Sequence, residues 1–114
     1  MAPLSMRARV ALRRLLDDVV AGRYSALESD GRVGRLTGDE VRRAIEVYGG
    51  KLMMPPADAI DCAEVYPVEN LPKRFAIDLP LWTEEAGRSD LTLLLRLDDD
   101  GDEPRVSIDD LRVL

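Results

Sequence analysis

The sequence predicts an α+β domain in which two N-terminal helices pack on an antiparallel sheet of three or four strands that ends in a hairpin. Apolar residues recur at helical spacing before residue 50, and they alternate with a period of two after residue 62. Helices followed by strands are typical of this class. A length of 114 residues is usual for one domain, so we expect a single domain over residues 1–114.

The first helix is predicted over residues 4–21 because its apolar residues fall on one face. These residues are Ala8, Leu12, Leu15, Leu16 and Val19. A second helix is predicted over residues 38–48. Thr37 and Glu40 form a capping box before it, and two glycines follow it. A short helical turn could lie between the two helices, near Tyr24.

Strands are predicted at about residues 62–68, 75–82, 90–98 and 105–113. The third has the clearest pattern, with leucine at every odd position from 91 to 97. Pro80 in the second strand indicates a sheet edge or a bulge. In the last strand the apolar residues change from even to odd positions, which predicts a β-bulge at Asp109 and Asp110.

The charge distribution favours a basic protein partner over nucleic acid. The net charge is −6, with +3 on residues 1–43 and −9 on residues 44–114. An acidic chain repels phosphate backbones, and it can steer a basic partner toward itself. No apolar run is long enough to span a membrane, and the arginines near the start interrupt any secretory segment. We therefore expect a cytoplasmic protein with no membrane partner.

The residue types present exclude several kinds of catalytic or metal site. The chain has no His, which rules out Ser-His and Cys-His nucleophiles and His-based zinc sites. Cys62 is the single cysteine, and we interpret it as a small core residue. The acidic loop at residues 98–103 lacks two ligands of an EF-hand, which favours a solvated hairpin tip. No motif predicts a cofactor or a metal.

The stretch LWTEEAGRSDLTLLLRL, residues 81–97, carries the candidate functional residues. Trp82 has the parity opposite to the apolar face of its strand, so it lies on a second face of the sheet or at the surface. Two interpretations stay open: a hydrogen-bonded structural connection in which Arg88 pairs with a neighbouring Glu, and an interface that displays the Trp. The candidate binding residues are Trp82, Glu84, Glu85, Arg88, Asp90, Asp109 and Asp110.

Two stretches of the sequence resemble a bacterial family of small uncharacterised proteins. Residues 82–92 are similar to its Trp-Thr-x-Glu-x-Gly-Arg-Ser-Asp-Leu-Thr stretch, and residues 108–114 are similar to its terminal Ile-Asp-Asp-x-x-Val-Leu. Ala86 and Arg112 depart from the family pattern, which has Gly or Glu and often His at these positions. The resemblance implies no catalytic residue.

A second resemblance concerns the fold. VVAGRYSAL after a first helix, together with a terminal hairpin, is similar to cystatin-like and nuclear-transport-factor-like cone folds. Those folds imply a small pocket or a dimer face. Small acidic bacterial proteins of such α+β folds also include immunity proteins, which neutralise toxins.

Three functional hypotheses follow. The first is a non-catalytic protein-binding module, such as an immunity-type protein that binds a basic partner. The second is a small-ligand or enzymatic pocket, in which carboxylates near Trp82 and on the last strand would converge as an acid/base pair. The third is a homodimer formed through the Thr92, Leu94 and Arg96 side of the leucine-rich strand.

Overall fold

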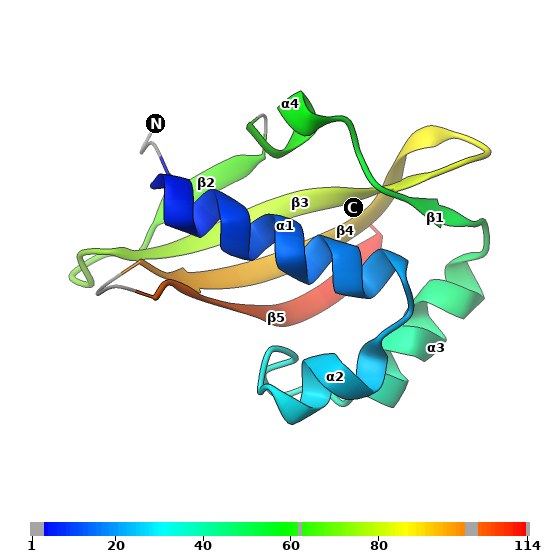
Figure 1. Ribbon diagram of the computed structural model, residues 1–114, viewed down its shortest axis with the longest axis horizontal. Coiled ribbons are helices and arrows are strands. Elements are labelled where there is room, and N and C mark those ends of the chain that lie inside the picture. The colour runs from blue at the N-terminus through cyan, green and yellow to red at the C-terminus, as the bar shows by residue number, and fades with distance from the viewer. Residues whose placement is uncertain (1–3, 62, 100–102, 114) are drawn as a thin grey trace.

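The predicted stripe of the first helix is its buried face. In the computed structural model, which describes residues 4–61, 63–99 and 103–113, helix α1 (Met6–Val20) lies across one face of an antiparallel sheet (Figure 1). The Ser5 hydroxyl caps the helix by accepting the Ala8 N–H at 3.0 Å. The buried residues of α1 are the predicted Ala8, Leu12, Leu15, Leu16 and Val19.

The sheet contains five strands in the described residues, which corrects the predicted three or four. They are β1 (Leu52–Met53), β2 (Glu64–Pro67), β3 (Arg74–Thr83), β4 (Gly87–Asp98) and β5 (Arg105–Val113). The strand order is β1-β3-β4-β5, and β2 also pairs with β3. Because β4 occupies one edge of β3, the two short strands β1 and β2 share the other edge, and they leave a gap between them.

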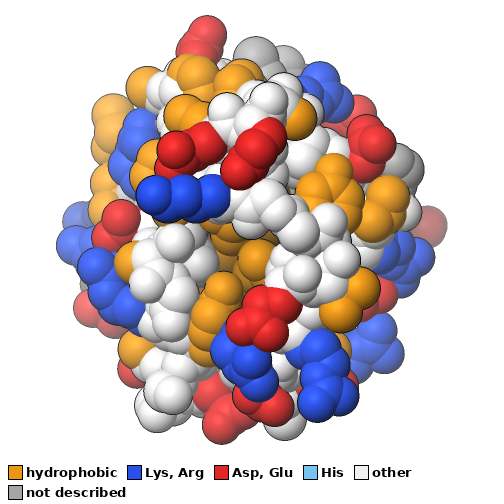
Figure 2. All heavy atoms as spheres, turned by 90° about the vertical axis from the view of Figure 1, so that its right-hand side faces the viewer, with side chains coloured by type: hydrophobic (Ala, Val, Ile, Leu, Met, Phe, Trp, Pro, Cys, Tyr) orange, Lys and Arg blue, Asp and Glu red, His pale blue; other side chains and the backbone are white. Residues whose placement is uncertain are grey.

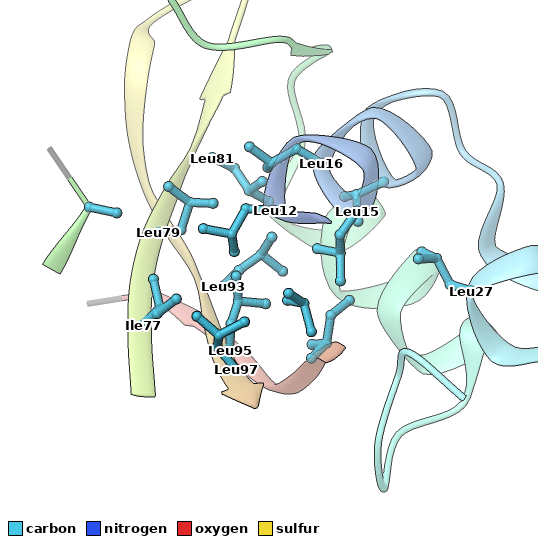
Figure 3. Close-up of a cluster of buried hydrophobic side chains, with 14 of the residues drawn as sticks. Leu12, Leu15, Leu16, Leu27, Ile77, Leu79, Leu81, Leu93, Leu95 and Leu97 are labelled. Carbon is cyan, nitrogen blue, oxygen red and sulfur yellow. The ribbon is translucent and has the colours of Figure 1, made fainter. Parts of the chain in front are cut away.

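The hydrophobic core fills the space between α1 and the sheet. Leucines of α1 point toward the odd-numbered residues of β3 and β4 (Figure 3). Of the predicted inward residues of these strands, Phe75 is half-buried. The others are buried: Ile77, Leu79, Leu81, Leu91, Leu93, Leu95 and Leu97. The leucine-rich strand is therefore central to the core, as its pattern predicts.

Two further helices lie beside the sheet. Helix α2 (Tyr24–Ser29) confirms the predicted helical turn, and α3 (Gly38–Tyr48) has the predicted bounds and the predicted Thr37–Glu40 capping box. Val41 and Ile45 of α3 are buried in the core, so the helix packs against the rest of the domain, but at the side of the sheet and not across its face as α1 does. Helix α3 packs on α2 and contacts the end of β5 (Figure 1), and Tyr48 at its last position is 37% exposed.

The chain between β1 and β2 forms a fourth helix, α4 (Ala57–Asp61), directly after two prolines. Two helices were predicted, and the described residues contain four. The short elements α4 and β1 lack the length that a periodic pattern needs. The predictions for Cys62 and for most of the hairpin tip fall on residues 62 and 100–102, which lie outside the described residues.

Both indications of a bulge are confirmed. The register of β4 with β5 shifts between Leu94, opposite Asp110, and Leu95, opposite Ile108, so Asp109 is the inserted residue. The register of β3 with β4 shifts between Pro80 and Trp82. Pro80 also faces the gap between β1 and β2, where no neighbouring strand needs its missing N–H.

Candidate binding site

One face of the sheet, which we call the open face, lies opposite α1 and carries mostly polar side chains. Alternation along each strand puts the even-numbered residues of β3 and β4 on this face. Asp78 on β3 lies opposite Glu64 on β2 and opposite Leu94 on β4. Trp82, placed on the second face by its parity, is half-buried there. The open face is where this domain could bind something without unpacking its core.

The open face is hollowed beside the gap between β1 and β2. The hollow, which we call the Trp82 pocket, has a volume of about 690 Å³, within the range of ligand sites. Helix α4 and the proline before it form one wall, and β2, β3 and β4 form the rest. The lining residues are Pro56, Asp58, Ala59, Glu64, Asp78, Pro80, Trp82, Arg88, Ser89, Asp90 and Thr92.

The charge of the Trp82 pocket is predominantly negative. Four carboxylates line it, from Asp58, Glu64, Asp78 and Asp90, against the single guanidinium of Arg88. The Tyr66 hydroxyl donates to the Glu64 carboxylate, and this bond raises the pKa of Tyr66 to about 12. Glu64 and Asp78 lie directly opposite each other on neighbouring strands, an arrangement that is destabilising for like charges. A cation in the pocket would relieve this repulsion.

The connection between β3 and β4 is held by side-chain hydroxyls. The Thr83 hydroxyl accepts the Ala86 N–H at 3.2 Å, and Gly87 takes a φ of 71°. The Ser89 hydroxyl donates to the Leu81 carbonyl at 2.7 Å and accepts the Leu91 N–H at 3.2 Å. Leu81 lies at the register shift and has no directly opposed residue on β4, and the Ser89 hydroxyl provides its carbonyl with a hydrogen bond there. This part of the candidate segment is a structural connection.

Glu84 and Glu85 lie at the tip of this connection and contact Lys51. The Lys51 ammonium pairs with Glu84 at 3.3 Å, and the Lys51 N–H donates to the Glu85 carboxylate at 2.9 Å. This backbone hydrogen bond lowers the pKa of Glu85. The expected pairing of Arg88 with Glu84 or Glu85 is wrong, since among the described residues neither Glu forms an ion pair with it.

Asp109 and Asp110 lie at the bulge of β5, away from the Trp82 pocket. Asp109 pairs with Arg96 at 3.8 Å, and Asp110 accepts from the Arg112 guanidinium at 2.6 Å and from the Leu111 N–H at 2.8 Å. The Arg112 guanidinium, followed by this N–H, lowers the pKa of Asp110.

The candidate residues therefore fall into three places. Trp82, Arg88 and Asp90 come together in the pocket, whereas the two Glu lie at the β3–β4 turn and the two Asp of β5 lie at its bulge. Sequence reasoning missed the other three acids of the pocket, which come from α4, β2 and β3. Asp78 alone had a signal, because it shares the parity of Trp82 within one strand.

The end of the molecule formed by β1, α3 and the β3–β4 turn has no uniform charge. Figure 2 shows acidic, basic and hydrophobic side chains interspersed there. At this end of the molecule, acidic side chains therefore alternate with basic ones, and negative charge does not dominate. The concentration of negative charge in the Trp82 pocket is a local feature of the open face.

The described residues contain no group of three or more carboxylate or Cys side chains arranged to hold a metal ion. None of the helices traced in the described ranges has the length and apolar character needed to cross a membrane.

Comparison with known proteins identifies the family and no more. A family model described as "Domain of unknown function (DUF7668)" matches residues 16–114, and the chain belongs to this family. No curated protein matches the chain, and no solved structure matches it. The matched residues include the five strands and the last residues of α1, and they include every element that lines the Trp82 pocket.

Proposed function

We propose that this protein is a non-catalytic binding module whose open face takes up a basic segment of a protein partner. The observation that carries the proposal is the Trp82 pocket, which is lined by four carboxylates and one half-buried tryptophan. A Lys or Arg side chain placed there would meet carboxylates for ion pairing and the Trp82 ring for a cation–π contact. An immunity-type role, in which the partner is a basic toxin, is one form of this proposal.

The electrostatics of the pocket support a cationic occupant. The carboxylates of Glu64 and Asp78 are directly opposed across the β2–β3 pair and repel each other. A cation bound between them would attract both carboxylates. Arg88 forms no ion pair with a described carboxylate, so a partner carboxylate beside the bound cation could pair with it. The pocket therefore fits a basic side chain that is followed by an acidic one.

A binding role is favoured over catalysis by the exposure of the pocket acids. Asp58, Glu64 and Asp90 are exposed to solvent, and general acid–base catalysis depends on desolvation or a close partner that tunes the carboxylate. The acids that the sequence suggested as an acid/base pair are also divided among three places. We therefore propose no reaction.

Fluorescence of Trp82 provides a direct test, because it is the only tryptophan in the chain. A short peptide with an Arg-x-Glu core is titrated into the protein, and a peptide with Glu in place of Arg is titrated in parallel. We expect a saturable change with the first peptide that weakens as salt is added. No saturable change with it, or an equal response to both peptides, would contradict the proposal.

Matched variants localise the binding. Asp78→Asn removes one pocket carboxylate, and we expect roughly fivefold weaker binding, equivalent to about 1 kcal/mol. Glu69→Gln changes the net charge by the same amount at an exposed position outside the pocket, so it should leave the affinity unchanged. Equal weakening by both variants would indicate attraction to the net charge alone.

A second candidate function is the binding of a small cationic molecule in the same pocket. The volume of about 690 Å³ favours it, since this is enough for a molecule larger than a single side chain. A thermal-shift screen of small amines distinguishes the two functions. Stabilisation by a free amine that Asp78→Asn abolishes, without binding of the peptide, would favour the small ligand.

A further inference from the structure

The outer edge of β5 is covered over only part of its length. The Ile108 N–H donates to the Arg32 carbonyl at 2.7 Å, and the Arg35 Nε donates to the Asp109 carbonyl at 3.3 Å. Beyond Asp109, no described residue outside β5 forms a hydrogen bond to the outward main chain of the strand. The loop around Arg32 therefore ends near the bulge, where Arg35 also pairs with the Asp110 carboxylate at 3.8 Å. The outward main-chain groups beyond it have no hydrogen-bond partner from another element among the described residues, although α3 lies beside this end of the strand.

The bulge sets which backbone groups face outward there. The N–H of Ile108 points away from β4. The single inserted residue shifts the alternation, so after the bulge the main-chain N–H and C=O groups of Leu111 and Val113 point away from β4. The bond from the Leu111 N–H to the Asp110 carboxylate agrees with this, since the N–H is not used by β4. An outward strand edge is a template for another strand.

We propose that a second copy of this chain pairs with this edge, so that β5 and β5 of the partner copy run antiparallel about a two-fold axis at Leu111. Such an isologous contact joins the two sheets into one continuous sheet. The surface differs from the Trp82 pocket and from the Thr92, Leu94 and Arg96 side of β4, and it does not depend on the proposed function.

Charge complementarity argues for a second copy rather than for another protein. Asp110 and Arg112 are two residues apart and flank Leu111, and they form an ion pair within one strand at 2.6 Å. A two-fold axis at Leu111 puts Asp110 of each copy opposite Arg112 of the other, so both ion pairs form across the interface. Opposite charges on directly opposed residues stabilise antiparallel pairs.

Apolar side chains beside the edge support the same occupant. Val113 is 59% exposed and Val47 on α3 is 82% exposed, and both line a shallow apolar groove with Leu111. In the proposed pairing the two Leu111 side chains meet at the axis, and each Val113 reaches Leu111 of the other copy diagonally. The interface would cover the apolar groups at the C-terminal end of the strand.

The solution mass of the full chain tests the proposal, measured by light scattering over a range of concentrations. We expect a dimer that dissociates on dilution. Arg112→Glu makes both flanking positions acidic and Asp110→Lys makes both basic, so each variant alone should be monomeric where the unaltered chain is dimeric. Circular dichroism establishes that each variant is folded.

Mixing these two variants provides the discriminating measurement. In the mixture each acidic position faces a basic one across the two-fold axis, so a heterodimer should form although neither variant dimerises alone. An unaltered chain that stays monomeric at every concentration would overturn the proposal. Variants that dimerise alone, or a mixture that stays monomeric, would do the same.

A second pair of variants tests the same surface if a charge variant fails to fold. Val47→Glu introduces a charge at the groove, and Met6→Glu introduces it at a similarly exposed residue, 76%, on α1. We expect at least a tenfold rise in the dimer dissociation constant for Val47→Glu and no change for Met6→Glu. Equal effects of the two variants would contradict the proposed surface.

Discussion

Replacing Ser89 with Ala tests whether the hydroxyl of this residue holds the β3–β4 connection together. The side chain is 7% exposed and bonds to two main-chain groups: it donates to the Leu81 carbonyl at 2.7 Å and accepts the Leu91 N–H at 3.2 Å. Leu81 lies at the register shift between Pro80 and Trp82 and has no directly opposed residue on β4, and Ser89→Ala leaves its carbonyl without the hydroxyl partner.

The expected loss follows from these two groups. A buried main-chain group left without a partner costs about 1–3 kcal/mol, so we expect Ser89→Ala to lower the free energy of unfolding by about 2–4 kcal/mol. For a chain of this length that corresponds to a fall in melting temperature of roughly 10 °C. The slope of the denaturant transition should not change, because the fold is retained.

Urea unfolding followed by circular dichroism measures this loss. Ser107→Ala is the matched control, since Ser107 is a half-buried serine on β5 whose hydroxyl bonds to none of the described residues. The control should change stability by no more than about 0.5 kcal/mol. A loss for Ser89→Ala as small as that of the control would refute the assignment of this hydroxyl to the bulge.

Three further predictions concern the helical part of the molecule. Gly38→Ala should cost about 1–3 kcal/mol in urea unfolding, because a Cβ there would lie 2.6 Å from the Tyr24 carbonyl oxygen; a neutral result would contradict the close α2–α3 packing. Thr37→Ala should cost about 1 kcal/mol by loss of the N-cap, and an unchanged melting temperature would count against the capping box. Burial raises the pKa of Asp18, but hydrogen bonds led by that from Arg32 outweigh it, so the folded pKa is lowered. Its stabilising contribution is therefore present above the unfolded pKa of about 4 and is lost as the pH falls through the folded value. Asp18→Asn should lower stability at pH 7 and flatten the acid side of the stability profile; a parallel profile would refute this linkage.

Features that depend on neighbouring residues could be predicted from the sequence. The buried stripe of α1, the capping box of α3 and the alternating leucines of β4 are local patterns, and the structure has all three. The bulge at Asp109 could also be predicted, because one inserted residue changes the parity of the apolar positions within a single strand.

Features that depend on contacts between distant segments could not. The elements α4 and β1 are five and two residues long, and so short a segment has no periodic signal. The place of α3 beside the sheet depends on its packing against α2, which no local pattern encodes. The acids of the Trp82 pocket come from four elements, so only their arrangement in space identifies them as a group.

The two interpretations of the candidate segment are reconciled by the register of the β3–β4 pair. Ser89 and Thr83 are buried and bond to the main chain of the connection, whereas Trp82, Arg88 and Asp90 line the pocket on the open face. The structural and the displayed residues therefore belong to one hairpin, and Ser89, whose hydroxyl bonds to the main chain, also lines the pocket. A change at Ser89 should be detected as lost stability, and a change at Asp90 as altered binding by a protein that still folds. The bulge links the two roles, because the Ser89 hydroxyl bonds to the Leu81 carbonyl, and Leu81 directly precedes Trp82 on β3.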